Sequence, residues 1–380
     1  MKILHIVAGA WESTGGPAEV IPNLCKALYE QGHDVTLLTV DGKHSNAVLE
    51  AKESGVRLIS FPSDTFKFCR YTTGTYSYLM KNISSFDLVH NHGHWLYPNW
   101  LAYFFCKKFS IKLITTPHGT LVPGMLKHKK LKKFISWHCF DKKIIQQSDV
   151  IHCLSEEEAK LTSLKVGVKN RHKIKILPNA ADKLSFNIET DKTEVNNPAN
   201  SEVYTILFMS RVSEIKGVRD LLAVWTAMEI PKNWKLQIIG AWDADLEYEK
   251  LKANSYSNIE VLGPIYGYKR FHNLRQADAF ILPSYGEGLP TALLEASASG
   301  KVILFSKECN FNLLEDSDGG IIFNAGEKGV REALNKLMAM SYSECGRLSN
   351  NAYELAIKKF SWPYIGQEWS KIYDRVLIKK

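Results

Sequence analysis

Short runs of nearly uninterrupted apolar residues recur along this chain, and segments with helical spacing separate them. Strands that are apolar on both faces belong to parallel sheets covered by helices on each side, so the alternation predicts an α/β fold. In the first half, the expected strands are residues 2–8, 34–40, 56–61, 86–90, 112–117, 150–154 and 173–177. In the second half, they are residues 204–209, 235–239, 258–262, 279–282, 302–305 and 320–323.

A change of texture near the middle of the chain indicates two domains. At 380 residues the chain is too long for a single ordinary core. Residues 196–200 read Asn-Asn-Pro-Ala-Asn, in a stretch with few apolar residues that is typical of a linker. We therefore predict an N-terminal Rossmann-like domain over 1–183, a linker over 184–201 and a C-terminal domain over 202–361. Two such domains with parallel sheets facing across a cleft would bind ligands at the carboxyl ends of their strands.

The composition excludes several classes of protein. With 45% hydrophobic and 23% charged residues and no low-complexity tract, the chain is neither disordered nor fibrous. Its seven cysteines are odd in number and scattered, which favours reduced thiols in a cytoplasm. The apolar run 3–10 follows Lys2 as in a signal peptide, but His5 interrupts it, so we expect a buried strand. No apolar stretch reaches the roughly 18 residues that span a bilayer, so we expect no integral membrane segment.

The formal net charge of +8 is unevenly distributed. Seven lysines lie between Lys127 and Lys143, opposed by Asp141 alone, and aromatic residues such as Phe134 and Phe140 interleave with them. Such a segment can lie on an anionic membrane surface, bind nucleic acid, or form a solvated helix that packs on its own domain. We retain the membrane surface and the solvated helix as alternatives, and we expect no nucleic acid partner.

The most informative motif spans residues 283–296 and follows a predicted strand. A glycine-bearing loop leads into a helix whose first turn holds Pro290. Such a helix start offers backbone N–H groups and the positive end of the helix dipole to an anion. Glu287 precedes the helix and Glu295 lies within it, and paired acceptors suit the hydroxyl donors of a sugar. A capped helix with solvated acids is the alternative.

A second motif, residues 210–217, joins a strand to a helix and carries Arg211 and Lys216. Two cations beside a helix N-terminus suit a diphosphate, and arginine adds a forked set of donors. A surface loop with ordinary charges is the alternative interpretation.

Two further loops follow predicted strands. Residues 116–120 read Thr-Pro-His-Gly-Thr, where Gly119 lets the backbone approach a ligand and His118 could donate to or orient a sugar. A lone histidine is more often structural. Gly15-Gly16 can approach an anion or a sugar, but the third glycine of the dinucleotide-binding fingerprint is missing. Elsewhere, Ser155 and Glu158 have the spacing of a helix capping box.

Two other clusters resemble metal sites, and we expect no metal at either. Residues 243–245 read Asp-Ala-Asp, but they lie in a polar loop without a phosphate-binding context. A histidine segment follows the strand predicted over 86–90 without a carboxylate cluster, and it could equally form an aromatic cleft wall for an acceptor sugar. This segment comprises His90, Asn91, His92 and His94, followed by Trp95, Tyr97 and Trp100.

Taken in order, these motifs resemble the retaining GT-B glycosyltransferases of family 4 (group 1 glycosyltransferases), over nearly the whole chain. In that family the C-terminal helix, here 362–380, crosses back to the N-terminal domain. The stretch 308–312 and the basic segment after His118 are similar to enzymes of bacterial surface-polysaccharide assembly. The matching pieces are Gly15-Gly16, His118-Gly119, Arg211 with Lys216, Glu287 with Glu295, and Phe360-Ser361-Trp362.

The resemblance implies a role for each matching position. Arg211 and Lys216 would hold the donor diphosphate and stabilise the leaving phosphate. Glu287 would contact hydroxyls of the donor sugar, Glu295 the ribose, and His118 the transferred sugar, while the base would lie near residues 263–268. The catalytic positions implied are thus Arg211, Lys216, Glu287 and His118. The donor-binding positions are Gly16, Arg211, Lys216, Gly263, Ile265, Glu287, Gly288, Leu289, Pro290, Thr291 and Glu295.

One departure from the family concerns residues 287–290. Many members read Glu-Gly-Phe-Gly where this chain reads Glu-Gly-Leu-Pro, and Pro290 has no N–H to give. The spacing of the two glutamates is kept, so we expect donor binding with a different fit around the sugar.

The resemblance implies a hexosyltransferase that moves a sugar from a nucleoside-diphosphate sugar, UDP being favoured over GDP, to a lipid-linked glycan acceptor. Lipopolysaccharide O-antigen or exopolysaccharide biosynthesis is the expected setting, in the cytoplasm and peripheral at the inner face of the cytoplasmic membrane. Fixed cations and helix dipoles would stabilise the leaving diphosphate without a metal. Since no residue stands out as a covalent nucleophile, we expect retention by a front-face route. The alternatives are a nucleotide-sugar epimerase of the same architecture and a basic protein that binds nucleic acid or a membrane surface.

Overall fold

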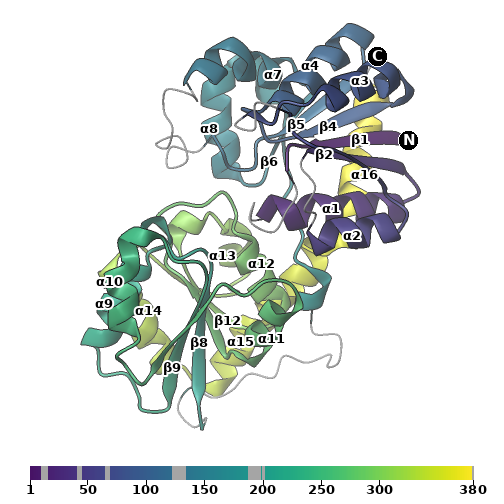
Figure 1. The fold of residues 1–380 in the computed structure, drawn as a ribbon. Coiled ribbons are helices and arrows are strands. Elements are labelled where there is room, and N and C mark those ends of the chain that lie inside the picture. The colour runs from purple at the N-terminus through teal and green to yellow at the C-terminus, as the bar shows by residue number, and fades with distance from the viewer. Residues whose placement is uncertain are drawn as a thin grey trace. The chain divides into compact units, whose positions relative to one another are not determined.

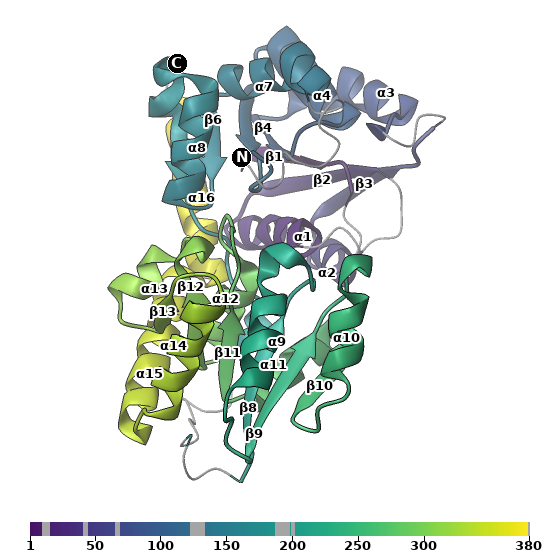
Figure 2. The ribbon, with the colours of Figure 1, turned by 90° about the vertical axis from the view of Figure 1, so that its left-hand side faces the viewer.

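The computed structural model describes residues 1–9, 16–40, 45–64, 69–121, 134–186, 198 and 202–378. The chain divides into two compact units, Met1–Asn179 with Trp362–Lys380, and Ala180–Ser361. Each unit is a parallel sheet with helices on both faces (Figures 1 and 2), so the predicted α/β architecture of two Rossmann-like sheets is confirmed. Of the linker expected over 184–201, all but residues 184–186 and 198 lie outside the described residues.

The sheet of the first unit has seven strands in the order β3-β2-β1-β4-β5-β6-β7. The chain winds outward from β1 to β3 and then returns to β4 beside β1, so the topological switch point lies between β1 and β4. Ligands of such sheets bind outside the carboxyl ends of the strands near this point. The strands are β1 Lys2–Val7, β2 Asp34–Val40, β3 Arg57–Phe61, β4 Leu88–His92, β5 Lys112–Thr116, β6 Val150–Cys153 and β7 Ile174–Ile176.

Helices cover both faces of this sheet, with α3 and α4 on one face and α1 and α2 on the other (Figure 1). Leu4, Val89 and Phe105 are fully buried in the core beneath α3 and α4. The C-terminal helix α16 packs on α1, where a Cβ on Gly366 would stand only 3.3 Å from that of Ala27. The helices are α1 Gly16–Glu30, α2 Asn46–Glu53, α3 Thr73–Asn82, α4 Tyr97–Phe109, α7 Lys142–Gln147, α8 Glu156–Val166 and α16 Trp362–Ile378.

The sheet of the second unit has six strands in the order β10-β9-β8-β11-β12-β13. Because β8 pairs with β9 on one side and β11 on the other, the switch point lies between β8 and β11. β11 and β12 are buried along their whole length, as apolar strands between two helical layers should be. The strands are β8 Tyr204–Met209, β9 Trp234–Ile239, β10 Ile259–Gly263, β11 Ala279–Leu282, β12 Val302–Ser306 and β13 Ile321–Phe323.

In this unit α9, α10 and α14 lie on one face of the sheet and α11, α12 and α15 on the other (Figure 1). The helices are α9 Val218–Ala227, α10 Glu247–Ala253, α11 Tyr268–Gln276, α12 Thr291–Ala298, α13 Asn312–Asp316, α14 Glu327–Met338 and α15 Tyr342–Lys359. Over the part of the chain that the structure describes, no helix has the length and apolar character that crossing a bilayer requires.

The prediction for the histidine segment is wrong in a way that matters for the site. β4 runs to His92, so His90, Asn91 and His92 lie inside the strand and are buried instead of following it. Their polar side chains break the apolar pattern expected of a buried strand, and the rings of His90 and His92 are instead hydrogen-bonded to other residues of the core. The segment after the strand forms α4, a helix that the sequence did not predict.

Candidate active site

Two loops of the second unit interlock at the switch point between β8 and β11. Residues 210–217 follow β8, and residues 283–290 follow β11. The N–H of Tyr285 donates to the carbonyl oxygen of Ile215 at 2.7 Å. Gly217 has φ 69°, and a Cβ there would stand 2.1 Å from the carbonyl oxygen of Pro283. Glycine is needed for this close approach, so backbone contacts hold the two motifs together.

Lys216 and Glu287 form an ion pair between these loops. Their side chains are only 17% and 13% exposed. Ser284 Oγ donates to the same carboxylate oxygen, Oε1 of Glu287, at 2.8 Å. Two residues predicted to hold different parts of a donor are thus brought together, with limited solvent to weaken their charges.

The loop that carries Glu287 is supported by the segment that follows β12. The N–H of Glu287 donates to the carbonyl oxygen of Glu308 at 2.9 Å, and Asn310 Nδ2 donates to the carbonyl oxygen of Glu287 at 2.7 Å. On the other side, Tyr285 Oη donates to Asp220 at 2.7 Å, and this bond raises the pKa of Tyr285 to about 12. The stretch 308–312 therefore supports the predicted donor loop.

Arg211 lies at the same edge of the sheet but makes a different contact. Its Nε is 4.0 Å from Asp243 Oδ1, and its side chain is 63% exposed. The N–H of Asp243 donates to the carbonyl oxygen of Val212 at 2.9 Å, which places the Asp-Ala-Asp segment beside the loop after β8. An exposed pair at this distance contributes little to stability, so Arg211 can turn toward a phosphate at small cost.

The predicted ribose and base positions are linked through α11. Glu295 on α12 is 5% exposed and accepts a hydrogen bond from Arg270 Nη2 at 2.8 Å. Arg270 lies on α11, which begins shortly after Gly263, the last residue of β10, and the loop that contains Ile265. Gly263 has φ 67°, and Ile265 is partly buried. Arg270 therefore joins the positions predicted for the ribose and the base, and no sequence motif marked it.

The helix start at α12 differs by one residue from the prediction. The helix begins at Thr291, and Pro290 is its N-cap. Leu289 and Pro290 are buried, whereas Gly288 and Thr291 are partly exposed. The carbonyl oxygen of Pro290 accepts the N–H of Leu293 at 3.1 Å, so the first turn is closed without a side-chain cap.

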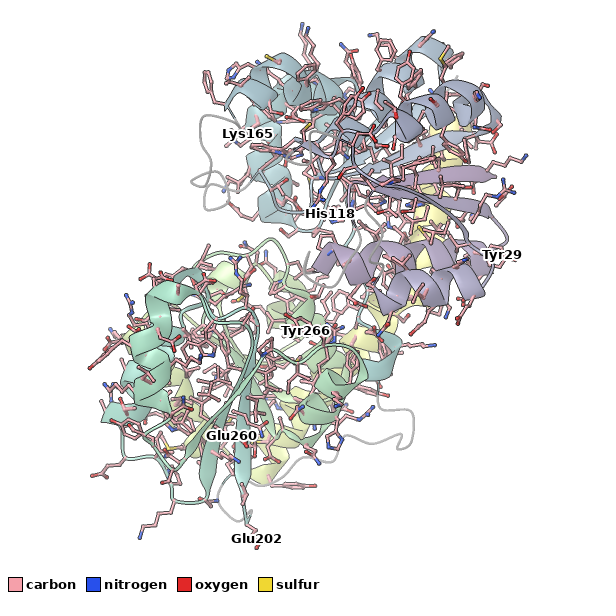
Figure 3. All side chains as sticks on the ribbon, in the orientation of Figure 1. Tyr29, His118, Lys165, Glu202, Glu260 and Tyr266 are labelled. Atoms are coloured by element: carbon pink, nitrogen blue, oxygen red, sulfur yellow. The ribbon has the colours of Figure 1, made fainter. Side chains whose placement is uncertain are left out.

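In the first unit, His118 follows β5 with φ 54° and is partly exposed (Figure 3). The N–H of Gly119 donates to Glu158 Oε1 at 2.6 Å, and the N–H of Leu154 donates to Glu158 Oε2 at 2.7 Å. Burial raises the pKa of Glu158, which is 1% exposed. Ser155 Oγ accepts the N–H of Glu158 at 3.2 Å, as in a capping box, but the carboxylate is used to hold the turn that carries His118.

Behind this turn, buried histidines occupy adjacent strands, and one hydrogen-bonded series reaches α16. His90 Nδ1 is 2.7 Å from Tyr373 Oη, and His90 Nε2 is 2.7 Å from Thr116 Oγ1. Thr116 Oγ1 is 2.9 Å from His152 Nδ1, and His152 Nε2 is 2.7 Å from the carbonyl oxygen of Leu177. The series spans β4, β5 and β6, and it ends on a group that can only accept.

The carbonyl of Leu177 fixes the direction of every bond in this series. His152 must donate from Nε2, so its Nδ1 accepts from Thr116 when the ring is neutral. The hydroxyl of Thr116 then accepts from His90 Nε2, and His90 Nδ1 accepts from the phenol of Tyr373. Burial supports the neutral rings, because it lowers the pKa of His152 to about 4 and holds the pKa of His90 well below its usual value.

His5, His90 and His92 lie close enough to share a metal ion. In this structure both ring nitrogens of His90 are hydrogen-bonded, and His5 Nδ1 is 2.9 Å from His92 Nε2. An ion would have to replace these bonds. The arrangement therefore fits a hydrogen-bonded cluster better than a ligand set.

The aromatic residues after β4 pack on a neighbouring segment. Trp100 stacks on Phe140 with ring centroids 4.4 Å apart, and Trp100 Nε1 lies 3.4 Å from Asp141 Oδ1. One face of the aromatic wall predicted to bind an acceptor sugar is thus covered by residues of the same unit. Gly16 is the first residue of α1, while Gly15 and the lysines of 127–133 lie outside the described residues.

Two family models match nearly the whole chain. Residues 14–183 match Glycosyltransferase Family 4, and residues 189–355 match Glycosyl transferases group 1. The chain is a group 1 glycosyltransferase. This glycosyltransferase is similar to Anabaena HepE, solved in complex with UDP and glucose, with TM-score 0.77, 13% identity and coverage of 99% and 100% of the two chains. That likeness confirms the GT-B fold.

Two relatives are similar in sequence to this glycosyltransferase. The phosphatidylinositol N-acetylglucosaminyltransferase gpi3 subunit of Schizosaccharomyces pombe is 23% identical over 378 residues, covering 95% of this chain and 78% of that protein. The N,N'-diacetylbacillosaminyl-diphospho-undecaprenol alpha-1,3-N-acetylgalactosaminyltransferase of Campylobacter jejuni is 27% identical over 194 residues, which is 50% of each chain.

The structure of the glycosyltransferase gives roles to residues that the sequence marked only for other reasons. Glu158 could have been found only as a capping acid, and its buried position beside Gly119 is not visible in sequence. In the sequence, His5 stands out only because it interrupts an apolar run, and His92 only as part of the histidine segment, whereas the structure brings the two rings together.

Proposed function

We propose that this glycosyltransferase transfers a hexose from a nucleoside-diphosphate sugar to a lipid-linked glycan with retention of anomeric configuration. The proposed setting is the assembly of a bacterial surface polysaccharide, such as lipopolysaccharide O-antigen or exopolysaccharide. The observation that carries the proposal is the Lys216–Glu287 pair at the switch point of the second unit. The pair places a positive charge and a hydrogen-bond acceptor at the carboxyl ends of the strands, where ligands of such sheets bind.

The positively charged side chains would stabilise the leaving diphosphate. As the bond between the anomeric carbon and the phosphate oxygen stretches, negative charge grows on the diphosphate and positive charge on the sugar. Lys216 and Arg211 supply fixed positive charge, and the start of α12 adds its dipole. In the structure Glu287 and Asp243 are their partners, and the diphosphate would replace these carboxylates. This route uses no metal.

The two carboxylates, those of Glu287 and Glu295, would accept hydrogen bonds from the sugar and the nucleoside. Once Lys216 turns to the phosphate, the carboxylate of Glu287 can accept hydrogen bonds from sugar hydroxyls. Glu295 would accept from the ribose hydroxyls, with Arg270 holding its carboxylate in place. The loop of Gly263 and Ile265 would meet the base. The UDP in the Anabaena HepE structure supports a UDP-sugar over a GDP-sugar.

Retention follows from a front-face route. The acceptor hydroxyl attacks the anomeric carbon from the side that the diphosphate leaves, and its proton passes to the departing phosphate oxygen. One glycosidic C–O bond forms as the sugar–phosphate C–O bond breaks, so the balance needs no other reactant. His118 would lie beside the transferred sugar.

A lipid-linked acceptor is supported by the relatives and by one surface. The names of both relatives contain a lipid, phosphatidylinositol in one and diphospho-undecaprenol in the other. Phe134, Ile135 and Phe140 are 62%, 53% and 45% exposed, and Lys142 and Lys143 follow them. Apolar side chains beside lysines suit an anionic membrane surface, so we propose a peripheral protein at the inner face of the cytoplasmic membrane.

The test has two stages. Thermal stabilisation against a panel of UDP- and GDP-sugars identifies the donor, because a ligand that binds only the folded protein raises the melting temperature. The chosen donor is then incubated with an undecaprenyl-diphosphate-linked saccharide, and the anomeric configuration of the product is read by NMR. Inversion at the anomeric carbon would contradict the proposal. So would an epimerised donor formed without acceptor, which is the outcome for an epimerase.

A further inference from the structure

A second series of imidazoles runs from the partly exposed His118 into the core of the first unit. His118 Nε2 is 3.1 Å from His92 Nδ1, and His92 Nε2 is 2.9 Å from His5 Nδ1. Successive rings stack, with centroids 5.3 Å and 5.1 Å apart. His92 is 3% exposed and His5 is fully buried. The series therefore joins a residue predicted to meet the sugar to side chains that no ligand can reach.

Each ring in the series carries a single proton near neutral pH. Burial lowers the pKa of His5 and His118 to about 3 and holds the pKa of His92 well below its usual value. A neutral imidazole has one N–H and one acceptor nitrogen. His92 is bonded at both nitrogens, so it donates through one and accepts through the other. One choice of direction thus sets the tautomer of all three residues.

The inner end of the series favours one direction. His5 Nε2 is buried and has no hydrogen-bond partner among the described residues. If the series ran inward, this nitrogen would carry an N–H without an acceptor, and such orphaned donors are rare in protein cores. In the outward direction, His5 Nε2 keeps only a lone pair. His5 Nδ1 then donates to His92 Nε2, and His92 Nδ1 donates to His118 Nε2.

We propose that His5 and His92 are positioning residues that hold His118 as the tautomer with its proton on Nδ1. His118 Nδ1 has no partner among the described residues, so it can offer this N–H to an oxygen of the sugar. His118 then acts as a hydrogen-bond donor and not as a base. The inference rests on the proposed function, because only there does His118 meet the sugar. The Gly119–Glu158 bond fixes the backbone of the same turn, and the imidazole series fixes the ring.

The tautomer can be read directly in the donor-free enzyme. Long-range proton–nitrogen NMR correlations of the histidine-labelled protein distinguish Nδ1–H from Nε2–H, and His118→Gln identifies its signals. We expect Nδ1–H for His118 in the native protein and a mixture of tautomers in His92→Phe and in His5→Phe. Proton occupancy on Nε2 of His118 in the native protein overturns the proposal.

Kinetics test whether the tautomer matters. His92→Phe should lower kcat about 10-fold or more, as loss of an orienting partner does at other sites, with the donor KM unchanged. His92→Gln should restore most of kcat, because its amide can accept from His5 and donate to His118. His152→Phe is the matched control: it removes a buried histidine from the other series and should leave the His118 tautomer unchanged. Equal losses of kcat in His92→Gln and His92→Phe would show that the series has only a structural role. That result would overturn the proposal that His92 positions His118.

The NMR readout needs no substrate, so the two proposals fail separately. An enzyme that transfers no sugar to any lipid-linked acceptor would contradict the proposed function and leave the tautomer measurement to decide on the imidazole series.

Discussion

The backbone N–H of Gly119 and the carboxylate of Glu158 are 39 residues apart in the sequence and 2.6 Å apart in the structure. The same carboxylate accepts the N–H of Leu154, so Glu158→Ala leaves one buried and one partly buried donor without an acceptor. Each buried donor left without an acceptor lowers the free energy of unfolding by about 1–3 kcal/mol. The turn that carries His118 also loses the hydrogen bond that holds it to Glu158. We expect a lower urea midpoint and a lower kcat.

Two further variants separate these effects. Glu158→Gln keeps one acceptor oxygen and should lie between the native protein and Glu158→Ala. Glu156→Ala removes an exposed acid from the same first turn of α8 and should change neither quantity by much. Native turnover in a folded Glu158→Ala protein would contradict the role given to the Gly119–Glu158 hydrogen bond.

The donor site makes a second prediction. Lys216→Ala and Arg211→Ala each remove a positive charge that is proposed to meet the leaving diphosphate. Loss of one preorganised group of this kind lowers kcat by about 10²–10³-fold. Turnover is measured as release of the nucleoside diphosphate. Lys235→Ala, which removes a lysine paired with Glu260 in the same unit, is the control and should keep native turnover. Near-native kcat in Lys216→Ala would refute the assignment.

The sequence predicts the pieces of this site better than it predicts their connections. Each strand–loop–helix piece is local, so alternating apolar runs and turn residues were enough to locate residues 210–217 and 283–296. The bonds that complete the site join distant positions: Lys216 to Glu287 over 71 residues, and His90 to Tyr373 over 283 residues. These depend on the order of strands in the sheet and on where α16 packs, which a local pattern does not encode.

The buried histidines make stability depend on pH. Unfolded histidine has a pKa near 6.5, whereas burial lowers the pKa of His5 and His118 to about 3 and that of His152 to about 4. Below about pH 6.5 the unfolded chain takes up protons that the folded protein does not. Stability is therefore fully present above this pH and falls on acidification toward pH 3–4, by up to about 1.4 kcal/mol per pH unit for each histidine.

The buried carboxyl of Glu158 acts in the opposite sense and offsets part of this loss, because burial raises its pKa. Urea unfolding at pH 7 and pH 5 measures the net effect. His5→Phe should flatten the dependence, whereas His172→Gln, at an exposed position, should leave it as in the native protein. An unchanged pH dependence in His5→Phe would contradict the contribution assigned to this histidine.

The hydrogen bond between Tyr373 and His90 carries the last prediction. Because the carbonyl of Leu177 fixes the direction of this series, the phenol of Tyr373 must donate to His90 Nδ1. Tyr373→Phe keeps the ring and leaves a buried acceptor without a donor, which should lower the free energy of unfolding by about 1–3 kcal/mol. Tyr29→Phe, at an exposed position on α1, is the control and should change the free energy of unfolding by less than about 0.5 kcal/mol.

NMR of the native protein should find the His90 proton on Nε2, because Nδ1 accepts from the phenol of Tyr373. A proton on Nδ1 would mean that the series runs the other way, and Tyr373→Phe would then orphan an N–H of His90 instead of an acceptor.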